Sequence, residues 1–246
     1  TTYIEGILNS ISSDGKIHTI YTQTVARTGR LSSIEPNLQN IPIRYELGRL
    51  IRKAFVPLDN SILMSCDYSQ IELRVFAHLS KVPELVNDMD IHTKTAMDIF
   101  HVKEEEVTKD MRRKAKAVNF GILYGISSYG LSEDLNIKPK EAKEFINKYF
   151  ETYPGVKEYM DKEIEEAKKN GYVKTIMNRK RIIEELHSSN HVVRSMGERM
   201  ALNTPIQGSS ADILKMAMIK IDKYFEDNNI KSTMLLQVHD ELIFNV

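Results

Sequence analysis

Residues 234–246 read MLLQVHDELIFNV, an apolar run on both sides of two adjacent acids, Asp240 and Glu241. Strand-forming residues around a short polar tip are typical of a β-hairpin. A second apolar segment, residues 62–66, also leads directly to an acid, Asp67. Between these distant segments the pattern is strongly helical from about residue 70 to 170. We therefore expect an α+β fold, with sheet pieces from both ends of the sequence and a helical insertion between them.

Local signals give the expected elements more detail. Ahead of the first acid we expect a helix over residues 4–11, a turn at Asp14-Gly15, a strand through residues 18–22, a loop over 28–42 and a helix over 46–53.

Within and after the helical region, Thr108 is expected to cap a helix, Pro139 to stand in a helix first turn and Gly171 to end a helix. Residues 172–185 predict a short basic hairpin. Two helices are expected after it, split at Pro205 because proline removes a backbone donor.

Composition sets broad limits on the class of protein. The 246 residues include 34 Lys plus Arg and 34 Asp plus Glu, so the net charge is zero. Basic residues nevertheless gather in clusters around residues 49–53, 112–116 and 179–181, and such clusters can bind phosphate. The single cysteine, Cys66, excludes an internal disulfide, and we expect a buried strand thiol. No apolar run reaches the roughly 18 residues of a membrane span.

The strand-end acids suit magnesium, a hard ion that prefers oxygen ligands. Two such ions would stabilise the attacking and leaving oxygens of a phosphoryl displacement. The competing interpretation is that Asp67, Asp240 and Glu241 cap turns or form surface ion pairs.

The helix expected after Thr108 carries Arg112, Lys116, Phe120 and Tyr124 at successive steps of four. Residues at this spacing share one broad helix face. Two cations followed by two aromatic rings could bind a triphosphate and stack on a base. From spacing alone, the favoured interpretation is an amphipathic helix with a solvated basic end and an aromatic core end.

The longer motifs resemble family A DNA polymerases, the bacterial DNA polymerase I type. The similar stretches are DYSQIELR (67–74), RRKAKAVNFGILYG (112–125), VHDE (238–241), TGRLSS (28–33), PNLQNIP (36–42), NTPIQG (203–208) and AD (211–212). They occur in the family's order and cover essentially the whole chain. Residues 176–186 depart from the family pattern because they lack its common glycine and proline.

The resemblance implies a role for each matching residue. Asp67, Asp240 and the Tyr68 carbonyl would hold two magnesium ions, with Glu241 in support. Lys116 would protonate the pyrophosphate leaving group. The incoming nucleotide would be bound by Gln70, Glu72, His92, Arg112, Lys116, Phe120 and Tyr124, with Glu72 closing off the sugar 2′ position. The primer–template would be contacted by Arg30, Gln39, Asn40, Arg199, Asn203, Gln207 and His239. For His92 and His239 a purely structural hydrogen-bonding role stays open.

The implied architecture is the right-hand polymerase fold, with an antiparallel palm sheet and an inserted helical fingers domain. The expected division is palm over residues 1–78, fingers over 79–189 and palm again over 190–246. Residues 1–10 resemble the end of a thumb helix. Without further thumb and palm segments the chain is expected to bind duplex weakly and to leave Leu242, Ile243 and Phe244 short of packing partners.

The implied activity is DNA-directed DNA polymerisation, a nucleotidyl transfer that serves replication and repair. Its partners would be primer–template DNA and dNTPs, with no membrane, in a cytoplasmic monomer; an organellar location is the alternative. One rival is a single-subunit RNA polymerase of the phage type, against which Glu72 argues. The other is a nucleic-acid-binding module without catalysis, against which Asp67, Lys116 and Asp240 argue.

Overall fold

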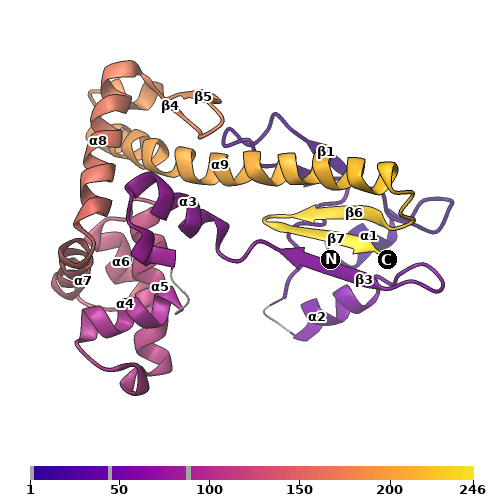
Figure 1. The fold of residues 1–246 in the computed structure, drawn as a ribbon, viewed down its shortest axis with the longest axis horizontal. Coiled ribbons are helices and arrows are strands. Elements are labelled where there is room, and N and C mark those ends of the chain that lie inside the picture. Colours follow the sequence, from indigo (N-terminus) through magenta and orange to yellow (C-terminus); the bar gives the residue numbers. More distant parts are fainter. Residues whose placement is uncertain (1–2, 44–45, 87–89) are drawn as a thin grey trace. The chain divides into compact units, whose positions relative to one another are not determined.

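A computed structural model describes residues 3–43, 46–86 and 90–246 of the chain. The chain divides into two compact units (Figure 1): Thr1–Ser69 together with Ser210–Val246, and Gln70–Ser209. Residues 1 and 2 of the expected first helix lie outside the described residues, and α1 covers Glu5–Leu8.

The first unit is built on an antiparallel sheet in the order β3-β7-β6. These strands are β3 (Leu63–Asp67), β6 (Thr233–Val238) and β7 (Glu241–Asn245). Leu242 and Phe244 alternate along β7 toward one face, where they are buried against the C-terminal part of α9 (His191–Asp227). The expectation that these two side chains lack packing partners is wrong, because Leu214 and its helical neighbours cover that face. The expected hairpin with an acidic tip is confirmed.

The remainder of the first unit precedes β3. A small sheet pairs β1 (Ile20–Thr22) with β2 (Ser32–Ile34), and α2 covers Glu46–Lys53 as expected. The strand β2 falls within the expected loop 28–42, so that loop is only partly correct. The hydroxyl of Tyr21 in β1 donates to the Gln237 carbonyl of β6 and accepts from the Gln237 amide, both at 2.9 Å. This pair of bonds fastens the small sheet to β6.

The second unit is largely helical, as expected. Its elements are α3 (Ile71–Ser80), η1 (Pro83–Val86), α4 (Ile91–Phe100), η2 (Glu104–Glu106), α5 (Lys109–Leu123), α6 (Ser128–Leu135), α7 (Pro139–Thr152), α8 (Pro154–Asn170), β4 (Tyr172–Lys174), β5 (Lys180–Ile182), η3 (Glu184–His187) and the N-terminal part of α9. The helices α4 and α5 pack against each other (Figure 1), with Ala96, Ile99, Val118 and Ile122 buried. None of the helices within the described ranges combines the length and apolar character that a membrane span requires.

The local capping predictions are confirmed. The Thr108 side chain accepts a hydrogen bond from the Met111 amide at 3.2 Å, Pro139 begins α7, and Gly171 ends α8 with φ of 74°. The basic hairpin is also confirmed as β4 paired with β5. These features depend on a few neighbouring residues, so they can be predicted from the sequence.

Two expectations about single residues are wrong. Pro205 does not split the chain into two helices, because α9 continues through it. Side chains supply local hydrogen bonds at this point: the Ser209 hydroxyl donates to the Pro205 carbonyl and the Thr204 hydroxyl to the Met200 carbonyl. Cys66 is exposed rather than buried. All of β3 is exposed, since α9 covers β7 and not this strand.

The two compact units meet at residues 69/70 and 209/210, whereas the expected domain boundaries are 78/79 and 189/190. Residues 71–78 belong to α3, which packs against η1 and α8. Ala201 of α9 packs in a buried cluster with Ala167, Val173, Ile183 and Leu186. These contacts place both segments in the helical unit. The assignment of the units as palm and fingers stays a prediction.

At Gly197 the helix α9 packs closely against the backbone of η3. A Cβ atom at this position would lie 2.8 Å from the Leu186 amide nitrogen and 2.9 Å from the Glu185 carbonyl carbon. Gly197→Ala should therefore lower the free energy of unfolding by about 1–3 kcal/mol, although alanine favours helix. Gly6→Ala is the matched control, because nothing lies within 4 Å of its Cβ position. Urea unfolding measures both, and an undiminished stability of Gly197→Ala would contradict this close approach.

Candidate active site

The two strand-end acids predicted from sequence are brought together in the sheet of the first unit. Asp67, the last residue of β3, pairs with Glu241, the first residue of β7. The backbone amide of Tyr68 donates to the Asp240 carbonyl at 3.2 Å. The antiparallel register therefore sets Asp67 beside the turn that carries Asp240, where His239 adopts a left-handed φ of 55°.

The carboxylates of Asp67, Asp240 and Glu241 lie close enough for the last two to repel a negative charge on Asp67. Partial desolvation, followed by the charges of Asp240 and Glu241, raises the pKa of Asp67 above its usual value. Arg30 lies close to the same group, with its Nη2 atom 3.6 Å from Oδ1 of Asp240. Glu241 accepts a hydrogen bond from the Ser65 hydroxyl. A cation placed at Asp67 and Asp240 would relieve the repulsion between them.

The oxygen donors of Asp67, Tyr68 and Asp240 are of the kind that suits a hard divalent cation. Within the described ranges, no three His, Cys, Asp or Glu side chains gather closely enough to hold a metal ion by themselves. Magnesium usually binds one or two carboxylates, while waters and substrate phosphates complete its coordination. Asp67 and Asp240, with the adjacent Tyr68 carbonyl, supply such a set. Glu241 is better suited to support, since Ser65 already engages its carboxylate.

The helix α5 in the second unit presents the residues predicted to bind a nucleotide. Arg112 and Lys116 are exposed, and Phe120 is half-buried. The Nζ atom of Lys116 lies 5.9 Å from the Phe120 ring centroid. The rings of Phe120 and Tyr124 are stacked at 6.3 Å. Cations and aromatic rings thus form one continuous face on the side of α5 away from its buried residues.

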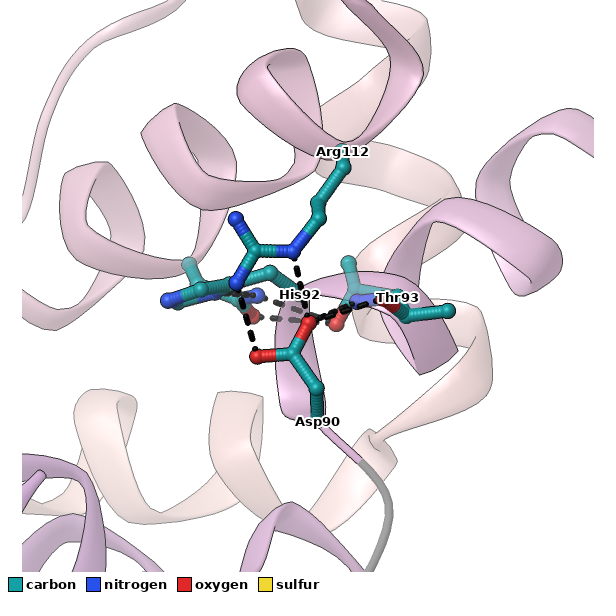
Figure 2. Close-up of polar contacts among 6 residues, drawn as sticks. Asp90, His92, Thr93 and Arg112 are labelled. Atoms are coloured by element: carbon teal, nitrogen blue, oxygen red, sulfur yellow. Dashed lines mark hydrogen bonds and ion pairs between the residues drawn. The ribbon is translucent and has the colours of Figure 1, made fainter. Parts of the chain in front are cut away.

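A carboxylate that the sequence analysis missed holds Arg112 (Figure 2). Asp90 accepts from the Nε atom of Arg112 at 2.9 Å and from Nη2 at 3.0 Å. It also caps α4, accepting from the Thr93 amide at 2.9 Å and the Thr93 hydroxyl at 2.8 Å. Although desolvation opposes it, this hydrogen bonding to Arg112 and Thr93 lowers the pKa of Asp90 to about 2. The Asp90 carboxylate therefore stays ionised at neutral pH.

His92 follows Asp90 in the first turn of α4 and is buried. Its Nδ1 atom is 3.1 Å from the amide nitrogen of Asn119, and Asn119 in turn bonds to Thr95. The His92 ring lies 5.6 Å from that of Phe120. Burial, helped by the positive charges of Arg112 and Lys116 and opposed by Asp90, lowers the pKa of His92. The role of His92 toward a nucleotide stays a prediction.

Glu72, the predicted gate at the sugar, is buried in α3 with 6% of its surface exposed. Its carboxylate accepts a hydrogen bond from the Tyr124 hydroxyl at 2.5 Å. This bond ties α3 to the end of α5. Gln70 precedes α3 in a left-handed conformation with φ of 54°, and its side chain makes no capping hydrogen bond.

The residues predicted to contact DNA fall into two groups. Arg30, Gln39, Asn40 and His239 belong to the first unit. Of these, Gln39 donates to both the side-chain oxygen and the carbonyl of Gln237, at 2.9 and 3.2 Å. Asn40 and His239 are exposed. Gln237 thus links Gln39 to Tyr21 near the acidic turn.

Arg199, Asn203 and Gln207 belong to the second unit and follow one another at steps of four along α9. The Oδ1 atom of Asn203 is buried and finds no hydrogen-bond partner within the described residues. Gly125, with φ of 67°, lies so close to Arg199 that a Cβ atom would be 3.2 Å from its Cγ. A side chain at residue 125 would therefore disturb Arg199.

Sequence reasoning missed Asp90, Asn119 and Gln237. An N-cap signal was present for Asp90, since it directly precedes the helical run that begins at Ile91. Asn119 lies inside a quoted motif, yet only the fold shows that it bonds to His92. No local signal identifies Gln237, whose partners Tyr21 and Gln39 are distant in sequence.

Comparisons with known proteins identify the family of the chain. The family model for DNA polymerase family A matches residues 1–246. DNA polymerase I of Bacillus subtilis is 58% identical over 250 residues, which cover 99% of this chain and 28% of that protein. DNA polymerase I of Bacillus caldotenax is 57% identical over 249 residues, again 99% of this chain and 28% of the relative. The chain therefore spans under a third of these relatives.

A solved structure is also similar. It is the POL domain of Pol1 from M. smegmatis in complex with DNA primer-template and dNTP. The TM-score is 0.94 at 51% sequence identity, over 98% of this chain and 44% of that one. Together with the family match over its whole length, these similarities show that the chain belongs to DNA polymerase family A.

Proposed function

We propose that this chain carries the nucleotide-addition residues of a DNA-directed DNA polymerase that extends a primer 3′-hydroxyl on a DNA template. The observation that carries the proposal is the register of β3 on β7, which brings the Asp67 and Asp240 segments together. The M. smegmatis structure supports the substrates, because it was solved with primer-template DNA and a dNTP. The relatives' bacterial origin supports a cytoplasmic enzyme, and we propose that it acts as a monomer.

The reaction joins the primer 3′ oxygen to the α-phosphorus of the incoming nucleotide and breaks the bond from that phosphorus to pyrophosphate. Magnesium bound at Asp67 and Asp240 would supply positive charge for the attacking and leaving oxygens. Asp67 and Asp240 must be ionised for this role, and a bound cation would offset the raised pKa of Asp67.

Residues of the second unit act on the nucleotide itself. Arg112 binds the triphosphate through its planar donors, and Lys116 donates a proton to the departing pyrophosphate oxygen. Phe120 packs on the base and sugar, continuing the face that Lys116 begins. Glu72 blocks a 2′-hydroxyl, which favours deoxyribonucleotides over ribonucleotides.

Removing either metal-binding carboxylate should abolish catalysis. In the protein that carries this chain, Asp67→Ala and Asp240→Ala should each reduce single-turnover dNTP incorporation by about 10³-fold or more, the order expected when charge stabilisation is lost. Asp59→Ala is the matched control, since Asp59 is an exposed acid of the same unit. Near-normal turnover of either variant with magnesium would refute the metal assignment. An unchanged unfolding temperature would show that the variants lost catalysis while keeping their fold.

Glu72→Ala should relax sugar selection. Loss of bulk at the 2′ position should lower the ratio of dNTP to rNTP incorporation efficiency by about 10-fold or more. Tyr124→Phe separates bulk from positioning, because it removes the hydrogen bond to Glu72 and leaves the carboxylate in place. We expect Tyr124→Phe to keep most of the selectivity. An unchanged ratio in Glu72→Ala would count against the gate.

A further inference from the structure

The contact between Asp90 and Arg112 lies outside the roles assigned so far. Asp90 is the N-cap of α4, and Arg112 is in the first turns of α5. The Asp90 carboxylate accepts from Arg112 through two donors and from Thr93 through two more (Figure 2). Thr93 thus holds the carboxylate on α4, independently of Arg112. The acid is a fixed partner rather than a freely moving one.

The geometry leaves Arg112 able to bind a second anion. A guanidinium carries five N–H donors in a planar fork. Asp90 engages the side of the fork, through Nε and Nη2. The donors of Nη1 and the second N–H of Nη2 point away from this edge. The Arg112 side chain is 47% exposed, against 33% for Asp90, and among the described residues only Asp90 accepts a hydrogen bond from its guanidinium.

We propose that Asp90 is a positioning residue for nucleotide binding: it orients the Arg112 guanidinium so that the remaining edge receives a phosphate of the incoming dNTP. This inference rests on the proposed function. Arginine often binds a phosphate through two parallel N–H donors, and a tethered guanidinium loses less freedom on binding than a free one. The carboxylate stays in place while the phosphate binds, and no bond between Asp90 and Arg112 has to break.

The rival possibility is competition. A carboxylate beside Arg112 also repels phosphate, and if the triphosphate had to displace Asp90, removing the acid would tighten binding. The two roles therefore predict opposite signs for a neutral substitution at Asp90. Positioning is favoured because the side-on contact and the free edge occupy different donors of the same guanidinium.

The test is Asp90→Asn in the protein that carries this chain, bound to a primer that ends in a dideoxynucleotide. Titration of the next correct dNTP then measures Kd without incorporation. Asparagine caps helices as well as aspartate does, so α4 keeps its cap. Loss of the charge-assisted bonds should raise the dNTP Kd about 5- to 10-fold. An unchanged or lower Kd would overturn the proposal.

Asp110→Asn is the matched control. Asp110 is an exposed acid in the first turn of α5 that pairs with Arg113 and Lys114. Its substitution makes the same change of charge on the helix that carries Arg112, so it reports the general electrostatic effect. We expect its dNTP Kd to stay within about 2-fold of the parent's.

A double-mutant cycle with Arg112→Gln separates positioning from a structural role. If Asp90 acts through Arg112, Asp90→Asn should add nothing to the Kd of Arg112→Gln. If the double variant instead raises the dNTP Kd by the product of the two single effects, the proposal is overturned. Extension of an ordinary primer by the unaltered protein tests the proposed function separately. Binding without extension would refute that function and leave the cycle valid, whereas absence of dNTP binding would refute both.

Discussion

The antiparallel pairing of β3 with β7 is the contact on which the first unit depends. It joins residues 63–67 to residues 241–245 across a long stretch of chain. Closing so long a loop is tolerable because the intervening residues 70–209 fold as a compact unit of their own. The burial of Leu242 and Phe244 holds the register, since a slip by one residue would turn them to the opposite face. The same register places Asp67 opposite Glu241.

In the second unit, the charged side chains of α5 lie on a helix that is held rigidly by its neighbours. Ala115, Val118 and Ile122 fix one side of α5 in the core, so the orientation of its other side follows. Hydrogen bonds then tie the exposed side to neighbouring helices: Asp90 of α4 reaches Arg112, and Glu72 of α3 reaches Tyr124. A helix surface supported at both ends keeps its polar groups in place without a ligand.

What could be read from sequence was local or recurrent. Caps at Thr108 and Gly171 depend on adjacent residues, and the acids at strand ends belong to recognisable motifs. The failures came from contacts between distant segments. The environment of Cys66 depends on which strand α9 covers. Likewise, α9 continues through Pro205 in spite of the local signal. The hydrogen bonds from Gln39 to Gln237 and from Arg112 to Asp90 could be identified only in the folded structure.

Because Cys66 is exposed, its thiol offers a site in the first unit for covalent labelling. It is the single cysteine of the sequence, and its side chain alternates along β3 with those of Ser65 and Asp67. Neighbouring residues of a strand point to opposite faces. A fluorophore or spin label attached through this thiol would therefore report from the back of the sheet, one residue from the acidic site, without occupying the face on which Asp67 and Glu241 lie.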